Sequence, residues 1–264
     1  IIKTEVSEIK NRFADKRRTQ IMSVSGEVDI EDLIPKEECV VTLTRFGYVK
    51  RQKVDTYKIQ KRGGRGVSGM TRREEDVPME MFILNSHDYI MFFTNLGRVY
   101  RLKCYEIPEG SRTSKGMNIA NLLPVTGDEK VTSMIRVDNF DEERFLVMGT
   151  KNGIIKRTHL SAYKNVRKGG LIAVDLDEGD ELAFVGVTDG EQELLLATKQ
   201  GMSIRFKESD VRVVSRTARG VKSIRLKMSD SVVGMAIIKE GGKILTVSET
   251  GYGRISNESD YRLQ

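Results

Sequence analysis

One short stretch of this sequence contains the residue types best suited to binding phosphate groups. Three cations are interleaved with glycines, which allow a backbone to approach a ligand closely. Successive backbone N–H groups in such a loop form a concave nest that binds anions. The stretch is not a nucleotide-binding P-loop, because it lacks the Gly-Lys-Ser/Thr ending that contacts nucleotide phosphates. Its residues are Gln60, Lys61, Arg62, Gly63, Gly64, Arg65 and Gly66.

Shorter basic loops recur later in the chain, each closed by a cation and a glycine. A single loop of this composition is equally consistent with a solvated turn. Recurrence at one position of a repeat favours a belt of phosphate-contacting loops instead. The cations of the later loops are Arg112, Lys115, Arg167, Lys168, Arg216 and Arg219.

Other site chemistries find no support in the sequence. His87 and His159 are the only histidines, and neither lies near a serine or cysteine in a nucleophile motif. Cys39 and Cys104 have no metal-ligand spacing and are too few for a disulfide framework. We therefore predict no catalytic residue, no metal site and no cofactor within this sequence.

Charge and hydropathy indicate the kind of partner and the location of the protein. The net charge of +6 and the isoelectric point near 9.2 favour a polyanionic partner. No apolar run approaches 18 residues and no signal-peptide pattern is present, so we expect an intracellular protein without a membrane span.

The elements that must position these loops follow a repeat. A Thr or Ser, two variable residues and a Gly return five times, with the glycines spaced 50, 56, 48 and 50 residues apart. A fixed period of this length is typical of propellers and related arrays. The repeated glycines are Gly47, Gly97, Gly153, Gly201 and Gly251.

Each repeat contains about four strand-like segments, which predicts a four-stranded propeller blade and an all-β fold. An apolar run precedes each repeated glycine, at residues 40–43, 90–93, 145–148, 194–196 and 244–247. A second strand follows the glycine and bears a base, and a further apolar run closes the unit at residues 79–84, 131–137, 182–187 and 232–238. The bases of the second strand are Arg51, Arg101, Arg157 and Arg205.

The two ends of the chain depart from the repeat. Residues 1–28 lie outside it, and apolar residues at helical spacing predict an amphipathic helix over residues 4–13, followed by a linker. We interpret this segment as the tail of an upstream domain and residues 29–264 as one array. The first unit has no clear entrance strand before Cys39, and the fifth stops before its basic loop. These features predict an array truncated at its C-terminus, with two unpaired strand edges.

The motifs together identify a family. Residues 60–66 resemble the box motif in the first blade of the C-terminal domain of DNA gyrase A subunits, and the repeats over residues 29–264 resemble the blades of that domain. Residues 8–19 are similar to the end of the breakage-reunion region of the same subunit. The resemblance implies a β-pinwheel, a propeller-like disc whose blades exchange strands and whose rim wraps double-stranded DNA. Six blades are usual in that family, and five are readable here.

The resemblance also implies a place in a larger enzyme. It implies a cytoplasmic bacterial type II topoisomerase of A2B2 composition, in which the B subunit hydrolyses ATP with Mg²⁺ and the active-site tyrosine lies upstream of this domain. With no Trp and no aromatics among the rim bases, we expect duplex DNA rather than stacked single strands. The expected contacts are the box residues Gln60, Lys61, Arg62, Gly63, Gly64, Arg65 and Gly66, with Arg51, Arg101, Arg112, Lys115, Arg157, Arg167, Lys168, Arg205, Arg216 and Arg219.

Two alternatives remain open at this stage. The C-terminal domain of the topoisomerase IV A subunit shares these blades but commonly has a degenerate box, so the intact residues 60–66 favour gyrase. A non-catalytic propeller scaffold for protein partners would need apolar or acidic recognition residues on one face. The recurring cations disfavour that class.

Overall fold

The computed structural model describes residues 2–15, 30–56, 76–111, 113–140 and 143–264. The predicted box, residues 60–66, and Arg112 lie outside these described residues, as does the predicted domain boundary at residue 28. The chain divides into two compact units, Ile1–Ile34 and Pro35–Gln264.

The first unit confirms the predicted helix. Helix α1 spans Ile2–Phe13 and is followed, beyond the undescribed segment, by the 3-10 turn η1, Ile30–Leu33. The apolar side chains of α1 are all exposed, and a glutamate in its first turn and two cations in its last turn suit the helix dipole.

The second unit is built from five β-hairpins. Their first strands contain the five predicted apolar runs, and the repeated glycine lies in the turn of each hairpin. The hairpins are β1 (Glu38–Thr44) with β2 (Tyr48–Lys53), β4 (Tyr89–Thr94) with β5 (Arg98–Lys103), β8 (Phe145–Thr150) with β9 (Ile154–His159), β12 (Glu193–Thr198) with β13 (Ser203–Lys207), and β16 (Lys243–Val247) with β17 (Gly253–Asn257).

The repeated Thr/Ser and Gly have a common structural reason. All five glycines have positive φ, from +71° to +86°, which a residue with a Cβ adopts only at a cost. The hydroxyl of the Thr or Ser accepts the backbone N–H four residues later; for example, Tyr48 donates to Thr44 Oγ1 at 3.1 Å. The same bond recurs at Thr94, Thr150, Thr198 and Ser248.

A third strand follows each of the first four hairpins and pairs antiparallel with the first strand of that same hairpin. The sequence analysis found no entrance strand before Cys39 and predicted an unpaired edge in the first unit; that edge is paired, because β3 follows the hairpin and pairs with β1. These strands are β3 (Pro78–Asn85), β7 (Val131–Val137), β11 (Leu182–Thr188) and β15 (Val232–Ile238).

The fourth strand of a sheet comes from the next unit. Strands β6 (Met117–Asn118), β10 (Leu171–Ile172) and β14 (Val221–Lys222) cross over to pair with β2, β5 and β9 of the preceding hairpin. Three sheets thus have the orders β3-β1-β2-β6, β10-β5-β4-β7 and β11-β8-β9-β14. Within the described residues, the fourth sheet has three strands, β13-β12-β15, and the fifth has β16 and β17. This strand exchange is the predicted pinwheel.

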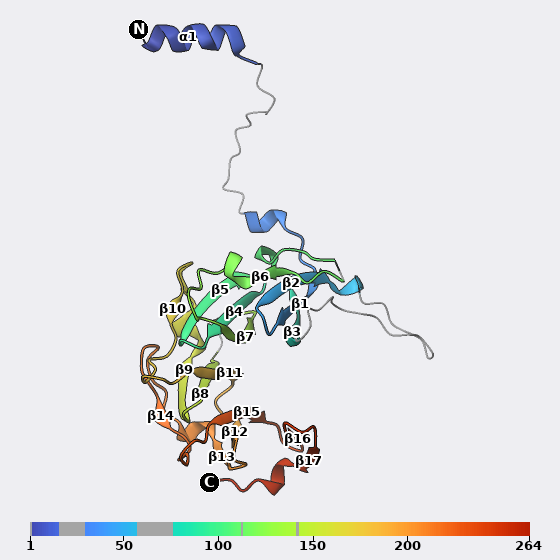
Figure 1. The fold of residues 1–264 in the computed structure, drawn as a ribbon, viewed down its shortest axis with the longest axis vertical. Coiled ribbons are helices and arrows are strands. Elements are labelled where there is room, and N and C mark those ends of the chain that lie inside the picture. The colour runs from blue at the N-terminus through green and yellow to red at the C-terminus, as the bar shows by residue number, and fades with distance from the viewer. Residues whose placement is uncertain (1, 16–29, 57–75, 112, 141–142) are drawn as a thin grey trace, which may run out of the picture. The chain divides into compact units, whose positions relative to one another are not determined.

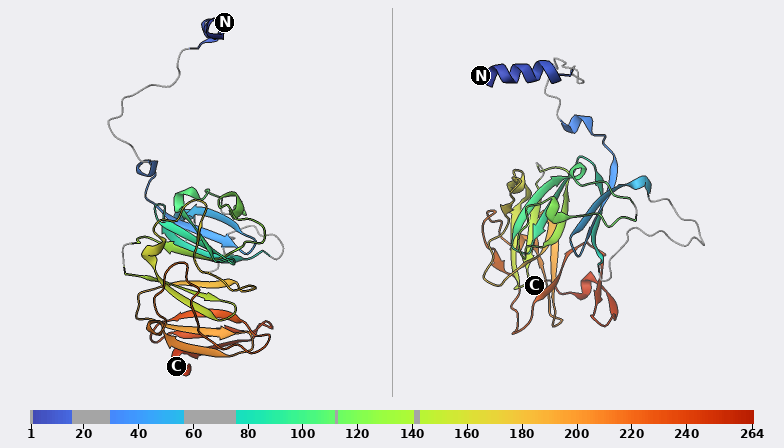
Figure 2. Two further views of the ribbon diagram at one scale, coloured as in Figure 1. Left: turned by 90° about the vertical axis from the view of Figure 1, so that its left-hand side faces the viewer. Right: turned by 45° about the horizontal axis from the view of Figure 1, so that its top comes forward.

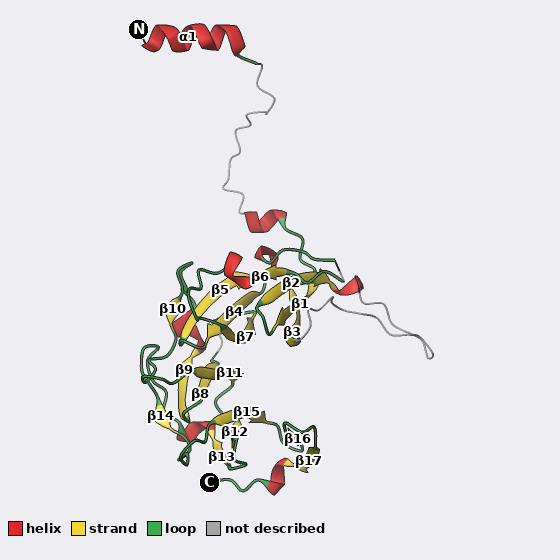
Figure 3. Ribbon diagram, viewed as in Figure 1, coloured by secondary structure: helices red, strands yellow, loops and turns green. Residues whose placement is uncertain are grey.

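The sheets of the second unit follow one another around an arc in chain order (Figure 1). The crossover strands β6, β10 and β14 lie on the convex side of the arc, and β3, β7, β11 and β15 lie on its concave side. Seen from the side, the sheets are stacked from the first to the last (Figure 2). Apart from α1, helical structure in the described ranges is confined to short 3-10 turns (Figure 3).

The core lies between successive sheets, because each central strand is buried on both faces. Phe92 and Phe93 are neighbours on β4, and side chains alternate across a strand. Phe92 accordingly packs with Val41 and Leu43 of the first sheet, whereas Phe93 packs with Leu146 and Met148 of the third. A further apolar cluster joins the third and fourth sheets.

Candidate nucleic-acid interface

The basic loops lie directly before the crossover strands, and so on the convex side of the arc. Lys115, Arg167, Lys168 and Arg219 are exposed in them. Residues 110–116 precede β6, residues 167–170 precede β10 and residues 215–220 precede β14 (Figure 1). The predicted repetition of cations at one structural position therefore holds for three of the loops.

Each loop needs a glycine where another part of the chain comes close, and in two loops that part is backbone. Gly116 has φ +85°, and a Cβ there would lie 2.4 Å from the carbonyl oxygen of Val49. Gly220 has φ +110°, and a Cβ there would lie 2.4 Å from the carbonyl oxygen of Ile155. In the loop of residues 167–170 the required glycine is Gly170, because a Cβ there would collide with the Tyr100 ring. Gly169 has no such contact. The glycines thus allow the crossover strand to dock on the preceding sheet.

Arg216 and Arg219 illustrate how the loop cations are held. The Nη1 of Arg216 donates to the carbonyl oxygen of Ile172 at 2.6 Å. Arg219 pairs with Asp177 at 2.7 Å and lies 3.9 Å from Asp175, and all three side chains are about half exposed. Exposed ion pairs of this kind contribute little to stability and are screened by salt. A phosphate can therefore compete with these carboxylates for Arg219.

The arginines of the second strands are placed differently from the prediction. The side chains of Arg51, Arg157 and Arg205 are only 14%, 10% and 14% exposed. Arg101 is half-buried, and its guanidinium lies 4.5 Å from the centre of the Tyr89 ring. These four residues therefore do not join the exposed loop cations, and we remove them from the expected DNA surface.

Each of these arginines instead binds the 3-10 turn of the next unit. Arg51 Nε donates to the carbonyl oxygen of Ile107 at 3.2 Å, directly after η3 (Cys104–Glu106). Arg101 donates to the carbonyl oxygen of Lys164, after η5 (Leu160–Tyr163), and Arg205 to that of Tyr261 at 3.1 Å, after η7 (Glu258–Asp260). Arg157 pairs with Glu208, the first residue of η6 (Glu208–Asp210). The repeated arginine is thus a contact between units.

Two buried lysines escaped the sequence analysis. Lys50 on β2 and Lys156 on β9 are each 1% exposed and precede the buried arginines Arg51 and Arg157. Their ammonium groups donate to backbone carbonyls of the basic loops. The signal that could have revealed them is the Lys-Arg pair three and four residues after the repeated glycine.

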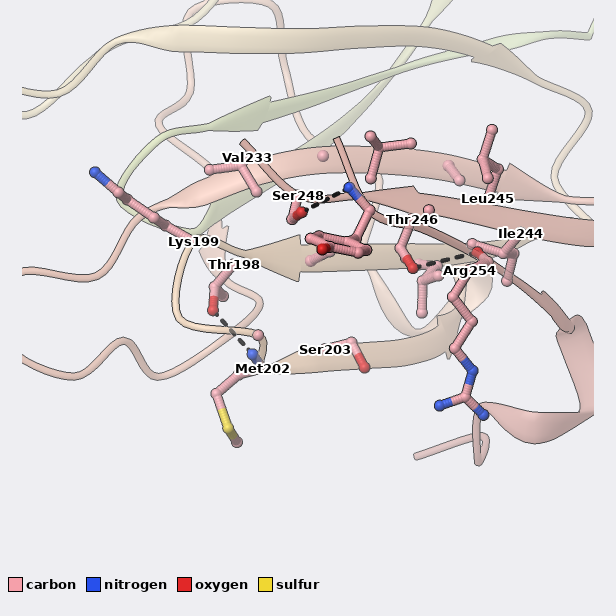
Figure 4. Close-up of a pocket in the computed structure, with 18 of the residues that line it drawn as sticks. Thr198, Lys199, Met202, Ser203, Val233, Ile244, Leu245, Thr246, Ser248 and Arg254 are labelled. Carbon is pink, nitrogen blue, oxygen red and sulfur yellow. Dashed lines mark hydrogen bonds between the residues drawn. The ribbon is translucent and has the colours of Figure 1, made fainter. Parts of the chain in front are cut away.

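A cavity of about 1040 Å³ lies between the fourth sheet and the last hairpin, and strand side chains such as Val233 and Leu245 line it together with Lys199 and Arg254 (Figure 4). No group of His, Cys, Asp or Glu in the described part of the chain could hold a metal ion. No helix among these residues is long and apolar enough to cross a membrane.

Comparison with known proteins matches this repeat unit by unit. The model of the DNA gyrase C-terminal domain, a β-propeller, matches residues 40–77, 88–138, 144–189, 192–239 and 242–264. Each matched segment contains one of the five hairpins. The chain belongs to the DNA gyrase C-terminal domain family. In this gyrase-family chain, the first matched segment, residues 40–77, includes the predicted box at residues 60–66.

Relatives and solved structures agree with this family. The chain is 50% identical over 222 residues to the A subunit of DNA gyrase from Clostridium acetobutylicum, covering 84% of this chain but only 27% of that protein. It is similar to a solved C-terminal domain of DNA topoisomerase IV, with TM-score 0.74, 29% identity and coverage of 88% and 71% of the two chains. A solved DNA gyrase A C-terminal domain has TM-score 0.68, 29% identity and coverage of 85% and 73%.

Proposed function

We propose that this gyrase-family domain wraps duplex DNA along the convex side of its arc. The observation that carries the proposal is the return of exposed cations, among them Lys115, Lys168 and Arg219, beside each of three successive crossover strands. DNA held at three such positions must follow the curve of the arc. We add the cations of residues 60–66 and Arg112 to the proposed DNA-contacting set because of their sequence pattern.

The energetics of bending explain why several loops are needed. A half-turn of duplex over roughly 40 bp costs on the order of 10 kcal/mol by smooth elastic estimates. One loop with two cations supplies too few phosphate contacts to offset that cost. Contacts distributed along a curved path can do so, and they are independent of base sequence because they involve the phosphate backbone. We therefore expect wrapping with little sequence preference.

The whole-protein context is part of the proposal. The relatives from Clostridium acetobutylicum and Staphylococcus aureus, at 50% and 44% identity, are A subunits of DNA gyrase, and this supports gyrase. The solved gyrase and topoisomerase IV domains are both 29% identical and do not distinguish the two. We place the chain in the A subunit of a bacterial cytoplasmic gyrase, an A2B2 enzyme in which ATP and Mg²⁺ act on the B subunit. The DNA-wrapping domain would then direct supercoiling, while cleavage takes place elsewhere in the A subunit.

A topological assay tests the proposal. A nicked plasmid is re-ligated in the presence of increasing amounts of the purified chain, stripped of protein and resolved into topoisomers. We expect the linking-number distribution to shift in proportion to the bound chain, because wrapped DNA is closed with altered writhe. A variant with Lys115, Lys168 and Arg219 changed to Ala should shift it less than a control with exposed Lys199 changed to Ala. If binding is saturated and the linking-number distribution does not shift, the domain binds DNA without wrapping it and the proposal is wrong.

A further inference from the structure

Two of the basic loops share a sequence pattern and also share a buried support. Both loops read Arg-Thr, a small residue, a base and Gly, over residues 112–116 and 216–220. The ammonium of Lys50 donates to the carbonyl oxygens of Ser111 at 3.3 Å and Ser114 at 3.0 Å. The ammonium of Lys156 donates to the carbonyl oxygen of Arg216 and, at 2.6 Å, to that of Ala173 directly after β10. The carbonyls of Ser111 and Ser114 beside the first pattern, and that of Arg216 in the second, are thus turned inward onto a lysine.

The same strand position has no lysine in the second unit, where the adjoining loop, residues 167–170, lacks the pattern. Three residues after its repeated glycine, the second unit has Tyr100. The Tyr100 hydroxyl lies 3.1 Å from both carboxylate oxygens of Glu129, and its ring packs under Gly170. The position therefore accepts an aromatic side chain, and the fold alone does not require an ammonium group there.

A buried ammonium is costly unless its donors are satisfied, and carbonyl acceptors offset that cost. Burial lowers the pKa of Lys50, and it lowers the pKa of Lys156 to about 8, with Arg216 lowering it further and Asp175 acting in the opposite direction. Keeping lysine at this position, where Tyr100 shows that an uncharged side chain fits, indicates a role beyond packing. The groups it binds are the backbones that carry the loop cations.

We propose that Lys50 and Lys156 are positioning residues for DNA wrapping, which hold the loops 112–116 and 216–220 from beneath so that their cations face the phosphates. The inference rests on the proposed function. The lysines themselves do not touch DNA. They fix the loop backbones, and this matters for wrapping because phosphates along a duplex have a fixed spacing that loosely held cations match less often.

The test compares Lys50→Met and Lys156→Met with Tyr100→Phe, a matched control that removes a buried polar group at the same strand position. Affinity for a duplex is measured at several salt concentrations, together with hydroxyl-radical footprints. For each Met variant we expect affinity to fall about tenfold and the slope of log affinity against log salt to lose about 2, since the two cations of one loop lose their phosphates. Tyr100→Phe should bind within about twofold of the unmodified chain, and Lys156→Arg should recover part of the loss.

The outcomes separate the two proposals. If the unmodified chain does not bind duplex, the proposed function fails. If it binds, and a folded Lys156→Met variant keeps the original slope and footprint, the positioning role is overturned. If the Met variants do not fold, the double variant Thr217→Gly with Ala218→Gly decides, because it keeps both arginines and loosens only an exposed loop backbone. Unchanged binding by that variant would also overturn the positioning role, and a loss of binding would support it.

Discussion

Arg157 on β9 and Glu208 at the start of η6 face each other across two units, with Arg157 Nη1 3.7 Å from Glu208 Oε2. The Glu208 carboxylate is fully buried and also accepts the Thr188 hydroxyl at 2.5 Å and the backbone N–H groups of Gly190 and Gln192 at 2.9 Å. One carboxylate therefore joins the third unit to the fourth.

Glu208→Ala is expected to lower the free energy of unfolding by about 3–5 kcal/mol, because it leaves Arg157 and three further donors without their buried acceptor. Urea denaturation monitored by circular dichroism measures this. Glu191→Ala, which removes an exposed carboxylate close by, should change stability by less than about 0.5 kcal/mol. Equal effects of the two substitutions would contradict a special role for Glu208.

Gly220→Ala is expected to destabilise the chain by more than about 2 kcal/mol, because the position combines a positive φ with a backbone oxygen 2.4 Å from the new Cβ. Gly169→Ala is the matched control, since no heavy atom lies within 4 Å of a Cβ built there. Thermal unfolding of both variants measures the difference. Similar melting temperatures would mean that β14 does not need its close approach to β9.

Changing Lys61, Arg62 and Arg65 together to Ala is expected to abolish wrapping without loss of the fold. These residues form a dense cluster of cations in the first unit, at the start of the proposed DNA path. Energy transfer between dyes at the two ends of a short duplex measures bending, and circular dichroism checks the fold. A triple variant that bends DNA as well as the unmodified chain would remove the box from the proposal.

Salt dependence is expected to be steep. After Arg51, Arg101, Arg157 and Arg205 are removed from the predicted set, nine cations remain, and nine phosphate contacts give a slope of about −8 for log affinity against log salt. Lys168→Ala should make the slope shallower by about 1, whereas Lys199→Ala should leave it unchanged. The nine are Lys61, Arg62, Arg65, Arg112, Lys115, Arg167, Lys168, Arg216 and Arg219. A slope near −2 would mean that few of them contact phosphate.

Stability should depend on pH through Lys156. Its folded-state pKa is about 8, lowered from 10.5 mainly by burial, so the unfolded chain binds more protons at this site between pH 8 and 10.5. Its contribution to the free energy of unfolding is therefore least favourable below pH 8 and becomes more favourable as pH rises through that window. The unmodified chain should gain stability relative to Lys156→Met between pH 7.5 and 9.5 in urea titrations. A difference that does not change with pH would contradict the lowered pKa.

Much of the fold follows from local patterns. The five hairpins, their glycine turns, the closing strands and α1 lie where alternation and spacing predict them, because strand and turn preferences are properties of short segments. The pairing of those strands does not follow from the same patterns. Strand β3 flanks β1 after the hairpin, so the first unit is not open where the sequence indicated. An open first unit and one closed by β3 have the same local sequence. Only the pairing of the strands in the folded sheets distinguishes them.

For the candidate interface, the sequence by itself determined which residues are cations, their repetition and the glycines that accompany them. Only the tertiary structure decided which cations are exposed. Arg51 donates to a carbonyl 56 residues away, and Lys156 donates to one 60 residues away. The repeat places Arg51 on a strand and Arg219 in a loop, but it does not show which of them is buried, because burial depends on strands exchanged between units. The exchange places some cations in contacts between sheets and leaves others on the convex side.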